Sequence, residues 1–64
     1  MLVERRMIAL RLRRGDWVCV RGRWHEVVAV RAHRYAAGGL VLVLVFNRAP
    51  AVRVYGADMM VVKR

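Results

Sequence analysis

The sequence of 64 residues contains no serine, threonine or glutamine, and only one cysteine, Cys19. The missing hydroxyl side chains are common nucleophiles of enzymes that work through covalent intermediates. A lone cysteine excludes a disulfide within one chain and fits a reducing cytosol. Cys19 stands between two valines, so we predict a buried packing residue and not a reactive thiol.

Long hydrophobic segments are also absent. The longest apolar run, Leu40–Phe46, covers seven residues, whereas a transmembrane helix needs about 20. The first ten residues lack the continuous apolar stretch of an export signal. We therefore expect a cytoplasmic protein without a membrane partner.

Acidic residues are few, with 4 Asp and Glu against 13 Lys and Arg, which gives a formal net charge of +9. Lys63 is the only lysine, so nearly all of the positive charge is guanidinium. A GC-rich coding sequence also raises the arginine content, and this interpretation stays open. It does not account for the shortage of acids. An excess of this size attracts polyanions such as phosphate backbones.

The side chains that carry chemistry show no catalytic or metal-ligand pattern. His25 and His33 lie eight residues apart, and neither has ligand spacing with the cysteine or with an acidic residue. Asp16 and Asp58 stand in turn sequences, which accounts for both of them. The glycine pair at 38–39 leads into an apolar strand and not into the helix that a phosphate-binding loop needs. We predict no enzyme activity, cofactor, metal or small-molecule substrate.

A chain of this length forms one domain and buries only about 60% of the surface of its unfolded state. We divide it into an N-terminal arm, residues 1–6, and a single small β-barrel domain, residues 7–64. Alternating apolar residues from Met7 to Leu12 favour a strand or an extended segment. A helix over 2–12 is the competing interpretation.

Short runs of strand-forming residues between turns predict an all-β fold of five to six antiparallel strands. Turns are expected at 14–16, 21–23 and 47–50, and a longer loop at 32–39. Strands are expected at 17–21, 24–31, 40–46, 51–55 and 59–63, with one 3₁₀ turn at 56–58 before the last strand. At this size a small barrel is the economical architecture.

The segments GDWVCVRGRW, VVAV and VRVYGADMMVV resemble, in this order, the strands of an SH3-like barrel. The resemblance covers residues 12–63 and places the 3₁₀ turn of such barrels at 56–58. The opening also resembles small actinobacterial and phage proteins, KOW-type domains and integrase C-terminal domains. Members of this fold bind DNA, RNA, peptides or their own copies, so the fold alone does not choose a ligand. The acidic loop and aromatic groove of proline-peptide-binding SH3 domains are missing.

Arginine and aromatic residues occur together at three places in the sequence. Such mixtures suit single-stranded nucleic acid, because guanidinium pairs with phosphate and aromatic rings stack on bases. Duplex binding through arginine in a groove is equally open. Protection of strand edges and solubility are the competing explanation for the charge. The predicted nucleic-acid-binding residues are Arg21, Arg23, His25, Arg31, Arg34, Tyr35, Arg53 and Tyr55.

Strict alternation puts Trp24 on the same side of its strand as Val28 and Val30, which makes it the candidate core tryptophan. Glu26 would then also point inward, and a β-bulge near His25 or Glu26 would resolve this conflict. Trp17 is the candidate for an exposed interface residue.

The run Leu40–Phe46 is apolar on both faces, although only one face of a barrel strand meets the core. We expect Val41, Val43 and Val45 to form an interface. The cover is either the arm, with Leu2 and Val3, or a second copy of the chain in a homodimer.

The favoured function is a small basic module that binds DNA or RNA through an arginine-rich face. The alternative is a protein–protein interaction or assembly module, in which the arginines serve solubility or an acidic partner.

Overall fold

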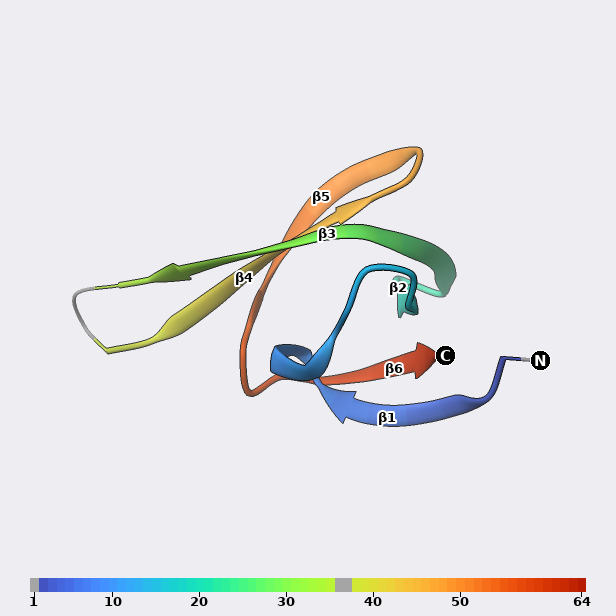
Figure 1. Cartoon of the computed structure of the whole chain (residues 1–64), viewed down its shortest axis with the longest axis horizontal. Helices are drawn as coiled ribbons and strands as arrows, with labels where there is room; N and C mark the ends of the chain where they lie inside the picture. Colours follow the sequence, from blue (N-terminus) through green and yellow to red (C-terminus); the bar gives the residue numbers. More distant parts are fainter. Residues whose placement is uncertain (1, 36–37) are drawn as a thin grey trace.

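The strand-forming segments build one antiparallel sheet of six strands, in a computed structural model that describes residues 2–35 and 38–64 (Figure 1). The elements are β1 (Glu4–Ile8), the 3₁₀ helix η1 (Ala9–Arg11), β2 (Trp17–Val20), β3 (Arg23–Arg34), β4 (Leu40–Phe46), β5 (Ala49–Tyr55) and β6 (Met59–Lys63). The strand order is β1-β6-β2-β3-β4-β5. The predicted all-β class is confirmed, and β4 has the predicted bounds.

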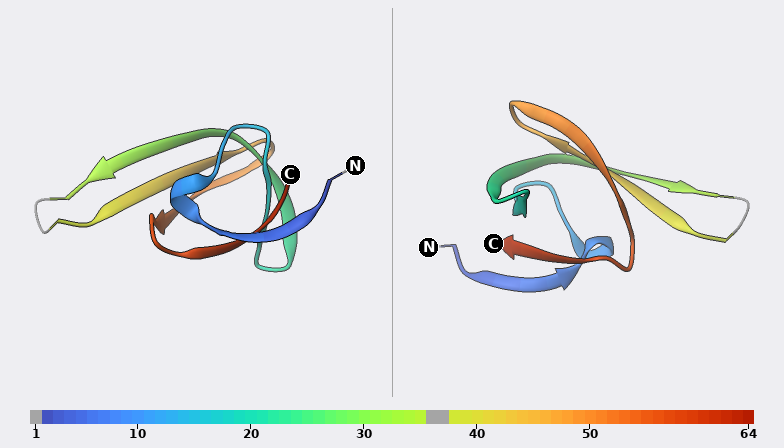
Figure 2. Two further views of the ribbon diagram at one scale, coloured as in Figure 1. Left: turned by 60° about the horizontal axis from the view of Figure 1, so that its bottom comes forward. Right: turned by 180° about the vertical axis from the view of Figure 1, so that it is seen from behind.

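The sheet bends at β3, which belongs to two half-sheets. Before the bend β3 pairs with β2, and after it β3 pairs with β4. Val27 pairs with Phe46 and Ala29 with Val45, so Val28 is an extra residue, a β-bulge that lets the strand turn. The half-sheet of β1, β6 and β2 folds beneath the half-sheet of β4 and β5 (Figure 2). In the described ranges β1 and β5 share no ladder, so the predicted barrel is not closed.

The N-terminal segment differs from its prediction. Residues 4–6 of the predicted arm belong to β1, which pairs with β6 from Glu4 opposite Lys63 to Ile8 opposite Met59. The arm therefore does not cover β4. The helix considered for 2–12 is reduced to the single turn of η1.

The sequence predicted a 3₁₀ turn at 56–58, before the last strand. In the structure the 3₁₀ helix η1 follows the first strand instead. Residues 56–58 form a plain turn, in which the Tyr55 backbone N–H donates to Asp58 Oδ2 at 2.9 Å. The two turns are joined, because Leu10 N–H donates to the Gly56 carbonyl at 3.0 Å.

Two further strand bounds differ. Ala32–Arg34 were predicted as loop but continue β3, because the ladder with β4 runs as far as Arg34 opposite Leu40. Pro50 was predicted to belong to the turn at 47–50 but lies inside β5. An extra residue stands there between the pairs Phe46–Ala49 and Leu44–Val52, and β5 is an edge strand, where a missing N–H is tolerated. Ala36 and Ala37 of the predicted loop lie outside the described residues.

The core lies between the two half-sheets and is made of aliphatic residues and one phenylalanine. Leu44, Val18, Val27 and Val62 are the largest fully buried side chains. The bulge at Val28 reverses the predicted inward and outward sides only for the part of β3 before it, since Val30 packs against the core as predicted. As a result Val27 is buried, while Val28 is 38% exposed and Trp24 is only half-buried. The prediction of Trp24 as a core residue is therefore wrong, and the bulge predicted near His25 or Glu26 lies at Val28.

Candidate nucleic-acid interface

The outer side of β3, β4 and β5 gathers most of the predicted binding residues into one surface, which we call the sheet face. The register places Arg31, Val43 and Arg53 in one cross-strand row. The next row holds His33, Val41 and Tyr55. Residues opposite one another in a ladder share a face of the sheet, so both rows point to the same side. The face is completed by Tyr35, which follows His33 by two residues. Arg34 pairs with Leu40 on the core side of the ladder, but it also lines a hollow with His33, Tyr35, Val41, Val43 and Arg53.

The two rows combine charge with apolar surface. Arg31 and Arg53 are exposed on either side of the half-buried Val43. Tyr35 is 50% exposed and Tyr55 is 64% exposed, and both line a hollow with Val41. The predicted interface valines and five of the predicted nucleic-acid-binding residues are therefore parts of the same surface.

The apolar strip on β4 is smaller than the sequence predicted. Val41 is only 7% exposed, and Val43 and Val45 are half-buried. Long side chains of β3 and β5 flank Val41 and Val43 in the register given above. Leu42, Leu44 and Phe46 face the core. Cover for the strip thus comes in large part from within the chain.

The other three predicted residues lie apart from the sheet face. Arg21, Arg23 and His25 line a groove with Phe46 and Pro50, which we call the turn groove. The His25 ring stacks on Phe46, with centroids 5.1 Å apart and planes at 26°. The predicted nucleic-acid-binding residues are therefore divided between two surfaces, the sheet face and the turn groove.

Arginine occupies a strained backbone conformation at two hairpin turns. Arg21 has φ 53° and Arg48 has φ 65°, a left-handed region that glycine or asparagine adopts more readily. Arg21 and Gly22, both with positive φ, form the two-residue turn that the register of β2 and β3 closes. Arg48 was not among the predicted nucleic-acid-binding residues. Its left-handed backbone conformation could not be recognised from the sequence alone.

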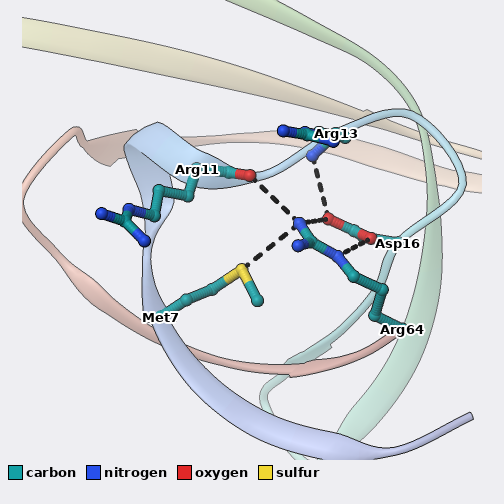
Figure 3. Close-up of polar contacts among 5 residues, drawn as sticks. All are labelled: Met7, Arg11, Arg13, Asp16 and Arg64. Carbon is teal, nitrogen blue, oxygen red and sulfur yellow. Dashed lines mark hydrogen bonds and ion pairs between the residues drawn. The ribbon is translucent and has the colours of Figure 1, made fainter.

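One carboxylate is paired with arginine. The Arg64 guanidinium donates to both Asp16 carboxylate oxygens, at 3.0 Å and 2.9 Å, and to the Arg11 carbonyl at 3.2 Å (Figure 3). Asp16 also accepts from the Arg13 backbone N–H at 2.9 Å. The Arg64 hydrogen bond holds the pKa of Asp16 below its usual range against the opposing effect of burial. This cluster fixes the turn before β2, so Arg64 has a structural partner.

The arginines of the sheet face are not neutralised in this way. Within the described ranges the Arg64–Asp16 pair is the one salt bridge. Asp58 follows Tyr55 of the sheet face by three residues in the sequence. Its carboxylate accepts a hydrogen bond from the Tyr55 N–H and so caps the turn after β5. The guanidinium groups of the sheet face thus have no salt-bridge partner among the described residues.

Trp17, predicted as an interface residue, lies on the outer side of the other half-sheet and is half-buried. Cys19 stands opposite Trp24 on that side and is half-buried, so it is less enclosed than predicted. The Lys63 ammonium lies 4.1 Å from the centre of the Trp24 ring. This face is therefore partly covered by its own lysine.

No protein-family model matches the chain, and searches of curated proteins and of solved structures found no match. The resemblance to SH3-like barrels and to actinobacterial and phage proteins stays a prediction. The described residues hold no group of three or more His, Cys, Asp or Glu side chains placed for a metal ion. They also contain no helix with the length and apolar character needed to cross a bilayer.

Proposed function

We propose that the protein binds nucleic acid, DNA or RNA, through the sheet face. The supporting observation is the register of β3, β4 and β5, which aligns Arg31 and Arg53 around Val43 and sets His33 and Tyr55 in the next row. Guanidinium groups match phosphate oxygens through paired hydrogen bonds. Apolar and aromatic groups between them suit the sugar and base parts of the same polymer.

The charge distribution supports a polyanion as ligand. The chain carries a net charge of +9, and the one salt bridge of the described residues lies away from the sheet face, at the turn before β2. Arginines that neutralise phosphates release the counterions condensed on the nucleic acid, so the affinity falls with added salt. With three phosphate contacts from Arg31, Arg34 and Arg53, raising the salt from 50 to 200 mM weakens single-strand binding about 20-fold.

Fluorescence anisotropy of labelled DNA and RNA oligonucleotides at several salt concentrations tests the proposal. The double variant Arg31→Ala/Arg53→Ala removes two charges from the sheet face. The negative slope of log affinity against log salt is expected to become shallower by about 1.4, since each phosphate contact contributes about −0.7 on single strands.

The matched control is Arg5→Ala/Arg14→Ala, which removes the same charge from exposed positions outside the face. Arg5 lies on β1, at the opposite end of the strand order from β5. An equal loss in both double variants would show that net charge alone attracts the ligand. Absence of binding to DNA and RNA at 50 mM salt would overturn the proposal.

A further inference from the structure

We infer that the sheet face selects single-stranded over double-stranded nucleic acid, with bases stacked on Tyr35 and Tyr55. The inference rests on the proposed function and specifies the form of its ligand. In this arrangement Arg31, Arg34 and Arg53 hold the phosphates of the same strand.

The first argument is the exposure of the two tyrosine rings. Tyr55 is 64% exposed and Tyr35 is 50% exposed, and together they line a hollow with Val41, Arg53 and Val54. Exposed rings beside a hollow are available for stacking with a planar group. Single strands present bases whose faces are open, whereas the bases of a duplex are already stacked on one another.

The second argument is the backbone that holds Tyr35 in place. Its N–H donates to the Gly39 carbonyl at 3.0 Å, and its carbonyl accepts from Gly38 N–H at 3.0 Å. Gly38 has φ 89°, a left-handed conformation that glycine adopts readily. Tyr55 is fixed in the same way by the Asp58 cap. Both rings therefore project from defined backbone positions, which favours stacking.

The third argument is the width of the face. The rows extend over three strands, and adjacent strands lie about 4.8 Å apart, so the outer backbones are about 10 Å apart before side chains are added. The major groove of DNA is about 12 Å wide and admits one helix or a two-stranded ribbon. With arginine and tyrosine side chains at both edges, the three-stranded face is too wide to enter the groove, but it can carry a strand laid across it.

The experiment compares three 12-nucleotide probes of one sequence: single-stranded DNA, single-stranded RNA and the DNA duplex. Anisotropy titrations at 100 mM salt are expected to give at least tenfold tighter binding for one or both single strands than for the duplex. The comparison between the DNA and RNA strands identifies which sugar the face accepts. A polyglutamate competitor separates stacking from charge, since it offers carboxylates without bases.

Variants of the tyrosines test the stacking contacts directly. Tyr55→Leu and Tyr35→Leu are each expected to weaken single-strand binding by about 5-fold to 150-fold, while the Phe variants keep most of the affinity. Leu2→Ala is the control, because Leu2 is 52% exposed and lies next to β1, outside the face. Its affinity is expected to stay within twofold of the parent chain.

The possible failures are distinct. Binding with equal or greater affinity for the duplex would overturn the inference and leave the proposed function standing. Leu variants that bind single strands as tightly as the parent would do the same. Displacement by polyglutamate as effective as by an unlabelled single strand would show that charge alone holds the ligand. No binding to any probe would overturn the proposed function together with the inference.

Discussion

Removal of the Asp16 carboxylate is expected to destabilise the fold by a large share of its total stability. Asp16 is 4% exposed, and it accepts hydrogen bonds from the Arg13 N–H and from the Arg64 guanidinium. These bonds join the turn before β2 to the residue that follows β6. Asp16→Ala leaves the Arg13 N–H without this acceptor and the guanidinium without its counter-ion.

The magnitude follows from the surroundings of the pair. Hydrogen bonds to charged groups contribute about 1.5–3 kcal/mol, but the Arg64 side chain is 37% exposed and solvent screens it. We therefore expect Asp16→Ala to lose about 2 kcal/mol of the free energy of unfolding. Domains of this size have about 3–5 kcal/mol in total. With a urea m-value of about 1 kcal/mol per molar, the midpoint falls by about 2 M.

Urea unfolding followed by tryptophan fluorescence measures this shift, and its pH dependence tests the cause. Because the folded-state pKa of Asp16 lies below the unfolded value, its contribution is fully present above about pH 4. It is lost as the pH falls through the folded-state pKa. The gap between the parent chain and Asp16→Asn should be constant from pH 5 to 8 and shrink below pH 4.

Asp58→Asn is the matched control, because Asp58 is exposed and the amide oxygen still accepts from the Tyr55 N–H. Its midpoint should move by less than about 0.5 M. Equal midpoints for the parent and Asp16→Ala at pH 7 would refute the reasoning. So would a gap that persists unchanged at pH 3.

Two further predictions concern the backbone. Deletion of Val28 removes the bulge and reverses the facing of all side chains on one half of β3, so that Val27 and Val30 no longer share the core side. Circular dichroism of this deletion variant should show loss of the fold. The substitution Val28→Ala keeps the bulge at this 38% exposed position, and a loss above about 1 kcal/mol would contradict the assignment. Arg48→Gly relieves the left-handed strain at φ 65° and should raise stability by about 0.5 kcal/mol, or the thermal midpoint by about 2–4 °C. A lower midpoint would contradict this account.

Local patterns predicted the elements that depend on local forces. The apolar run Leu40–Phe46 and the turn at 21–23 need only their own residues to be recognised, and both are found. The turn roles of Asp16 and Asp58 were also found, as backbone caps. The pairing of strands that are distant in the sequence could not be predicted from local patterns. Residues 4–6 have no strand signal of their own and are ordered by β6, which lies more than fifty residues away in the sequence.

The candidate site shows the same division. Residue types indicated which side chains suit a phosphate polymer, but not which of them meet. Their meeting depends on the register of β3 against β4, and one extra residue, Val28, sets that register. Alternation in 51–55 placed Arg53 and Tyr55 on one face of their strand, but residues 32–35 were predicted as loop and were not assigned to a face. Nothing in the sequence showed that Val43 would lie between Arg31 and Arg53, or that Arg21 and Arg23 would belong to a separate groove.

The pairing of the first strand with the last has a consequence for how the chain folds. β6 lies between β1 and β2 in the sheet, so the half-sheet is incomplete until Met59–Lys63 has left the ribosome. Until then Val18 lacks its neighbour Val62, and β1 has no partner strand. Contacts between residues so distant in the sequence slow folding to milliseconds or longer. The half-sheet therefore forms only after β6 has emerged, and truncation before β6 should yield an aggregation-prone polypeptide.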